Sequence, residues 1–187
     1  MSFGLMAVVY DVMDKIEAGG NKDHIYRVLK AMKLSENGDS LFASRNGMGA
    51  IEKHEAALKE LEGIPQAASI QGAIMGALVS DYGIAGQPGR ALAIGHQALK
   101  ELGKDPRLAV ALGNCLHDMG VAMVSSSKPA EAISYLERAL RAYETTPDGA
   151  GPAANCLRDI NRIKTELHGK VPTRDKPKSW ISRLLGK

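Results

Sequence analysis

The sequence repeats itself with a period of 41 residues, and this period restricts the possible folds more than any other feature. Pro65, Pro106 and Pro147 share one phase of it, so each lies 41 residues after the one before. The block 50–61 also recurs one and two periods later. A period of roughly 20–50 residues is typical of arrays in which each unit is one supersecondary structure that buries its apolar face against its neighbours.

Each unit is predicted to be a pair of helices. In the third unit, apolar residues recur at helical spacing between Leu108 and Met123, as expected for one buried face. A break follows at Ser125, Pro129 suits the first turn of the next helix, and a second apolar stripe leads to Tyr143. Aromatic residues make up only 4% of the chain, which favours close-packed helices over strands. We therefore expect an all-α protein.

The third unit resembles the tetratricopeptide repeat (TPR) family. The second unit departs from that pattern at Val79 and Gly95, and the polar segment 35–39 could break the first helix of the first unit. The resemblance implies a right-handed helical-hairpin solenoid of about three TPR-like repeats, with first helices longer than in the usual unit of 34 residues. The residues that carry it are Leu116, Met119, Gly120, Met123, Ala132, Leu136 and Ala139.

The period also predicts the domain organisation. We expect one helical repeat domain over 1–168, followed by a basic linker and short amphipathic tail over 169–187. A stack of repeats needs polar terminal elements, so a capping helix is expected at each end. The expected divisions are an N-terminal capping helix over 1–22, repeats over 23–63, 64–104 and 105–145, and a C-terminal capping helix over 146–168.

Charge is unevenly divided between these two parts. The tail 169–187 holds six basic residues and one acidic residue, a net charge of +5, whereas the whole chain carries +3, which leaves −2 for residues 1–168. A general nucleic-acid binder would need basic charge spread over a face, so no nucleic-acid partner is expected.

Three further features predict a cytoplasmic location. No stretch approaches 18 consecutive apolar residues, so no transmembrane span is expected. No basic residue precedes the first apolar stretch, unlike in a secretory signal. Cys115 and Cys156 lack a CxxC spacing, and we expect both to be small buried residues, too far apart for a disulfide.

No catalytic or metal-binding constellation is recognisable in the sequence. The five histidines lack paired-ligand spacing, and there is no phosphate-binding loop, GxGxxG or GxSxG motif. We therefore expect a chain that is not an enzyme and needs no cofactor or metal.

The TPR resemblance implies a peptide-binding groove lined by the first helices. Asparagine can pair with a peptide backbone and arginine can clamp a carboxylate, which would suit an extended or acidic peptide. In the alternative interpretation the arginines are only the solvated face of the last helix, neutralised by Asp118 and Asp159. The candidate groove residues are Ser80, Asn114, His117, Val121, Asn155, Arg158 and Arg162.

The tail carries a second candidate contact, formed by Trp180, Ile181, Leu184 and Leu185. It could dock on a protein, bind an anionic membrane surface or have no role. The function expected from the sequence is a non-catalytic protein–protein interaction scaffold that binds a partner's peptide segment in the groove. The alternative is a peripheral membrane-associated assembly factor anchored by the tail, and self-association into a homo-oligomer also remains open.

Overall fold

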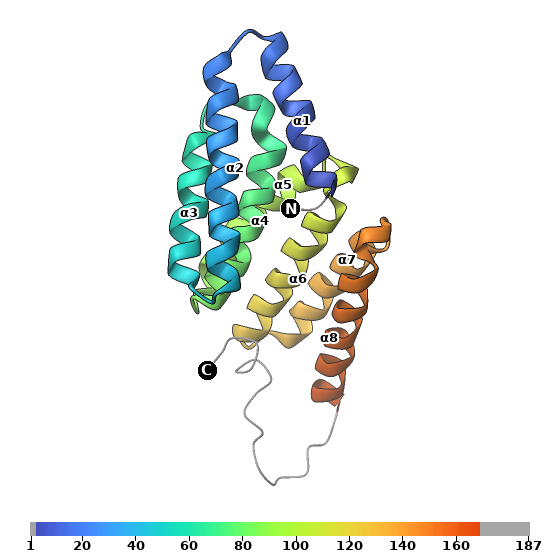
Figure 1. Cartoon of the computed structure of the whole chain (residues 1–187). Helices are drawn as coiled ribbons and strands as arrows, with labels where there is room; N and C mark the ends of the chain where they lie inside the picture. The colour runs from blue at the N-terminus through green and yellow to red at the C-terminus, as the bar shows by residue number, and fades with distance from the viewer. Residues whose placement is uncertain (1–2, 169–187) are drawn as a thin grey trace.

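The computed structural model describes residues 3–168 of the chain, and every regular element in this part is helical (Figure 1). Trp180, Ile181, Leu184 and Leu185, the predicted tail contact, lie outside the described residues. The α-helices are α1 (Phe3–Ala18), α2 (Lys22–Ala43), α3 (Gly47–Glu60), α4 (Ala68–Ile84), α5 (Pro88–Leu102), α6 (Ala109–Ser125), α7 (Pro129–Tyr143) and α8 (Ala150–His168). Three 3-10 turns, η1 (Pro65–Ala67), η2 (Pro106–Leu108) and η3 (Pro147–Gly149), precede α4, α6 and α8.

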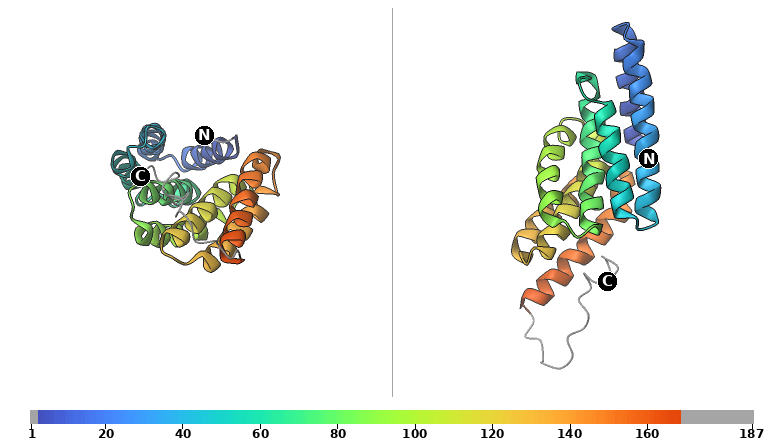
Figure 2. Two further views of the ribbon diagram at one scale, coloured as in Figure 1. Left: turned by 90° about the horizontal axis from the view of Figure 1, so that it is seen from below. Right: turned by 90° about the vertical axis from the view of Figure 1, so that its left-hand side faces the viewer.

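The helices pack as hairpins in chain order. α2 pairs with α3, α4 with α5 and α6 with α7, and the second helix of each hairpin also contacts the helix that follows it. Figure 2 shows the hairpins along an arc, with α1 on its open side. We call the surface formed by α2, α4, α6 and α8 the inner face.

Local sequence signals place the helix boundaries. Pro88 and Pro129 each begin a helix, where the missing N–H of proline leaves no hydrogen bond unmade. The side chains of Asn21 and Asn46 accept hydrogen bonds from backbone N–H groups in the first turns of α2 and α3. The polar segment 35–39 does not break α2, which is continuous from Lys22 to Ala43.

Glycine lets the two helices of a hairpin approach closely. A Cβ on Gly38 would lie 2.6 Å from the His54 ring, and a Cβ on Gly120 would lie 2.9 Å from Leu136. One helix therefore gives up its side chain where the other places a large one. In the second hairpin the same two positions hold Val79 and Gly95, so the roles are exchanged.

The N-terminal helix reaches further than a cap on the first repeat would. α1 contacts α2, but it also contacts η1, α4 and η2. Gly4 passes so close to the Arg107 carbonyl that a side chain there would overlap it, and Arg107 forms an ion pair of 3.2 Å with Asp11. α1 thus covers part of the inner face, with Val8 and Ile16 buried beneath it.

The third hairpin begins with the most apolar segment of the described chain. Residues Pro106–Ser125, covering η2 and α6, are long and apolar enough to cross a membrane by length and composition, although no such span was expected. Half of this stretch is buried inside the protein, and Leu116 and Met119 of α6 belong to its core. A core helix of a packed bundle has the same composition, so this is weak grounds for a membrane span.

Gly113→Ala tests the close approach of α6 and α7. The added methyl would overlap the ring of buried Tyr143, whose hydroxyl is held by Asn114, so we expect a loss of about 1–3 kcal/mol in the free energy of unfolding. Gly89→Ala in α5 is the matched control, because no atom lies within 4 Å of the place that its added methyl would take. Urea denaturation should show no loss for the control, and equal stability of both variants would contradict the packing described here.

Candidate functional site

A pocket of about 200 Å³ opens between α2, α4 and α6 on the inner face. Its walls combine small and apolar residues with several polar groups, and they come from three successive hairpins. No single hairpin forms this pocket, because its residues meet only when the hairpins pack side by side. The lining residues are Asp39, Phe42, His54, Ala73, Gly76, Ala77, Ser80, Asp81, Ala111 and Asn114.

A buried histidine–aspartate pair forms part of the pocket wall. His54 Nδ1 lies 2.6 Å from Asp81 Oδ2, and each side chain is only 1% exposed. His54 Nε2 lies 3.5 Å from Asp39 Oδ1, within ion-pair distance but without hydrogen-bond geometry. His54 Nε2 and Asp81 Oδ1 are consequently two buried polar atoms without a hydrogen-bond partner.

The charges of this pair are governed by burial and by the neighbouring carboxylates. Burial lowers the pKa of the His54 imidazole, but the carboxylates of Asp39 and Asp81 outweigh this and raise it to about 9. Burial also raises the pKa of the Asp81 carboxyl, against the opposing effect of His54. The imidazole is therefore cationic at neutral pH and is flanked by two acidic side chains.

The repeat shows that packing does not require this pair. One period later its positions hold Gly95 and Ala122. Two periods later they hold Leu136 and Ile163, both buried in one apolar cluster. The same structural place is therefore filled by a charged pair only at the interface that borders the pocket.

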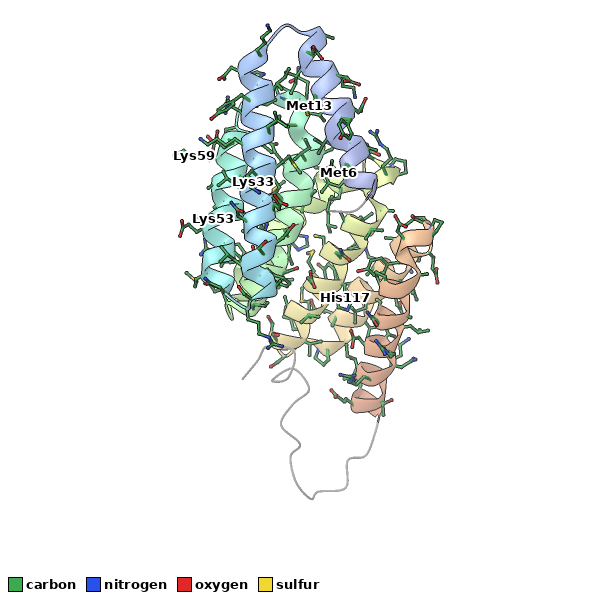
Figure 3. All side chains as sticks on the ribbon, in the orientation of Figure 1. Met6, Met13, Lys33, Lys53, Lys59 and His117 are labelled. Carbon is green, nitrogen blue, oxygen red and sulfur yellow. The ribbon has the colours of Figure 1, made fainter. Side chains whose placement is uncertain are left out.

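A second polar cluster lies further along the inner face, around His117 of α6 (Figure 3). His117 Nε2 lies 3.0 Å from Asp159 Oδ2 of α8, and Nδ1 lies 3.5 Å from Asp118 Oδ1. Ser80 of α4 donates a hydrogen bond to Asp118. Burial lowers the pKa of His117, but the two carboxylates outweigh it and raise the pKa to about 9. The cluster therefore links α4, α6 and α8.

The structure brings some of the predicted groove residues together and separates others. Ser80 and His117 share the cluster around Asp118, and the exposed Asn114 accepts a 2.8 Å hydrogen bond from Tyr143. Burial raises the pKa of Tyr143, so its hydroxyl stays a donor. The rest line no part of the pocket: Asn155 and Arg158 pair with each other on α8, Val121 is half-buried on α6, and Arg162 is exposed on α8.

Sequence reasoning missed the groups that define the pocket, namely Asp39, His54 and Asp81. A usable signal was present, because His54 stands at the repeat position that holds the core residue Leu136 in the third unit. A titratable residue at a periodic core position requires a buried partner. The partner could not be read from the sequence, since the equivalents of Asp81 are apolar.

The cysteines and histidines show no second type of chemistry in the described chain. Cys115 and Cys156 are free and buried, and burial raises the pKa of the Cys115 thiol to about 12 and that of Cys156 to about 11. Such thiols are poor nucleophiles at neutral pH. Within residues 3–168, no group of three or more histidine, cysteine, aspartate or glutamate side chains is arranged to hold a metal ion.

Comparison with known proteins gives no relative for this chain: no family model matches the sequence, and no curated protein matches it either.

Exchange of the buried pair for its apolar counterpart separates stability from binding. His54→Leu or Asp81→Ile alone should each lower the free energy of unfolding by about 3–5 kcal/mol, because one buried charge loses its partner. The double variant introduces the residues found two periods later and should recover to within about 1 kcal/mol of the natural protein. Chemical denaturation of the four proteins measures this, and a double variant as unstable as the worse single one would show that the pair is needed for packing.

The two histidines also predict how stability depends on pH. Their pKa values are raised in the folded protein to about 9 from 6.5, so their contribution is complete below pH 6.5 and is lost as the pH rises through about 9. We expect a decrease of at most on the order of 3 kcal/mol per histidine between pH 6.5 and 9.5. Denaturation at several pH values checks this, and the double variant His54→Leu/Asp81→Ile should lose less than the natural protein over the same interval.

Proposed function

We propose that this chain is a non-catalytic protein–protein interaction module, a TPR-like right-handed solenoid that binds an extended segment of a partner along its inner face. The observation that carries the proposal is the pocket between α2, α4 and α6, which exists only because three hairpins lie side by side. Concave sites shared between packed elements are the usual places where proteins bind ligands.

Polar groups on the inner face suit a peptide backbone. Asn114 is exposed at the pocket and carries an amide whose N–H₂ group can donate to a peptide carbonyl while its oxygen accepts from Tyr143. Ser80, on the neighbouring helix, adds a hydroxyl to the same wall. A segment that lies across α4 and α6 would meet both groups.

α1 defines which part of the inner face is open to a partner. It packs over α2, η1, α4 and η2, whereas the pocket is lined by residues nearer the C-terminal ends of α2 and α4. The partner segment is therefore placed beside α6 and α8, away from α1.

The remaining expectations from the sequence stay proposals. A cytoplasmic location is in keeping with two free, buried cysteines. The alternative of a membrane-associated assembly factor depends on Trp180, Ile181, Leu184 and Leu185, which lie outside the described residues, and no feature of residues 3–168 favours it over peptide binding. Self-association stays open as a second use of the same surfaces.

Site-specific photo-crosslinking in cells that produce the chain naturally tests the proposal. A photoreactive residue replaces Asn114 on α6 or Asn155 on α8, both exposed on helices of the inner face, and Gln97 on α5 serves as the exposed outer control. We expect the same partner to be crosslinked from positions 114 and 155 and not from position 97.

A pocket-filling variant makes the test specific to the site. Ala77→Trp should reduce crosslinking from position 114 by about tenfold, which corresponds to about 1.4 kcal/mol of binding free energy, because the indole occupies the pocket. Ala93→Trp on exposed α5 is the matched control and should leave crosslinking unchanged. Equal crosslinking from positions 97 and 114, or insensitivity to Ala77→Trp, would contradict binding at the inner face.

A further inference from the structure

We infer that the pocket between α2, α4 and α6 is a receptor for the ammonium group of a lysine side chain in the partner segment. This inference rests on the proposed function and adds to it the chemical class of the partner's anchoring residue. Four observations on the pocket support it, and each is independent of how the rest of the segment lies.

The first observation is that the pocket contains buried polar atoms without partners. Asp81 Oδ1 and His54 Nε2 have no hydrogen-bond partner, and both residues are 1% exposed and line the pocket. A buried acceptor without a partner costs about 1–3 kcal/mol, more if it is charged. A donor placed in the pocket would remove this cost for the Asp81 carboxylate.

The second observation is the sign of the charge. The carboxylates of Asp39 and Asp81 line the pocket, and Asp118 is close enough to act on Asp81. The imidazolium of His54 balances only one of them. No lysine or arginine occurs among the described residues that line the pocket, and Figure 3 shows Lys53 and Lys59 on the outer side of α3. The site therefore favours a cation over an anion.

The third observation concerns shape. Ala73, Ala77 and Ala111 form small apolar walls, Phe42 adds the face or edge of an aromatic ring, and the volume is about 200 Å³. A lysine side chain has four methylene groups, which can lie against such walls while the ammonium reaches the carboxylates. Its three N–H donors can be shared among Asp39, Asp81 Oδ1 and the Ser80 oxygen, all on the pocket wall.

The fourth observation is that the charged pair is confined to this one interface. The equivalent positions of the repeat hold Gly95 with Ala122, and Leu136 with Ile163. Replacement of a buried ion pair by apolar residues is often neutral or stabilising. A pair that packing does not require, beside the pocket and with a free carboxylate oxygen, is accounted for by a bound cation.

Binding of Nα-acetyl-lysine amide to the full chain tests the inference directly. NMR titration should show saturable shifts of the backbone amides of Ala77 and Ala111, with a dissociation constant of about 1–10 mM. Nα,Nε-diacetyl-lysine amide has the same stem but no charge and should bind at least about tenfold more weakly. Nα-acetyl-arginine amide separates lysine from cations in general, and equal binding of the arginine compound would overturn the assignment to lysine.

The titration of His54 supplies a readout that a purely apolar contact would not change. A cation held beside the imidazole should lower the pKa of His54 from its value of about 9, since like charges disfavour the protonated form. The neutral diacetyl compound should leave that pKa unchanged. Absence of saturable shifts at about 50 mM lysine compound, or equal shifts with the neutral compound, would overturn the inference.

Two variants assign the binding to this pocket. Asp39→Asn removes one carboxylate from an exposed side chain and should weaken binding by about tenfold, whereas Asp14→Asn on exposed α1 removes the same charge elsewhere and should have little effect. Ala77→Leu narrows the pocket without a change of charge and should also weaken binding. An unchanged affinity in both Asp39→Asn and Ala77→Leu would place the cation elsewhere.

The outcomes also distinguish this inference from the proposed function. Crosslinking from position 114 that is sensitive to Ala77→Trp, together with no preference for the lysine compound over its neutral analogue, would leave peptide binding intact and overturn the lysine assignment. Lysine binding in the pocket without any crosslinked partner would instead contradict the scaffold proposal and retain the cation site.

Discussion

The close approach of the two helices in each hairpin is the constraint on which the rest of this structure depends. It is possible only where one of two facing positions is glycine, as at Gly38 opposite His54 and Gly120 opposite Leu136. The large residue then fills the space left by the missing side chain, so that the core is close-packed although aromatic residues are rare. The same requirement returns every 41 residues, which is why a short chain with few bulky residues produces a regular series of hairpins.

The first hairpin satisfies this constraint with a residue that introduces a charge problem. The His54 ring fills the place opposite Gly38 as Leu136 does opposite Gly120, but its nitrogens need partners inside the protein. Asp81 supplies one partner from the next hairpin and so joins two units by a buried ion pair. Such a pair contributes little net stability, because removal of both charges from water opposes their attraction. Its presence is better explained by the acidic pocket that it creates on the inner face.

Much of the fold could be predicted from the sequence, because periodicity reports on packing. The helical content, the turns that begin at Pro65, Pro106 and Pro147, and the burial of both cysteines all follow from positions that repeat. The position of α1 could not be predicted, since no repeat contains its contact with η2. The pairing of His54 with Asp81 was also hidden, because the two residues lie 27 positions apart and their counterparts in other units are apolar.

The arrangement of the inner face limits what a partner can gain from it. α1 already covers the surface near η1 and η2, so the open part is short and lies around the pocket and the cluster of His117. A small contact area binds tightly only where a few residues contribute most of the free energy. One ammonium group in a partly buried acidic pocket meets that requirement, because a charge-assisted hydrogen bond is stronger away from water. Recognition would then depend on the position of one lysine more than on the sequence around it.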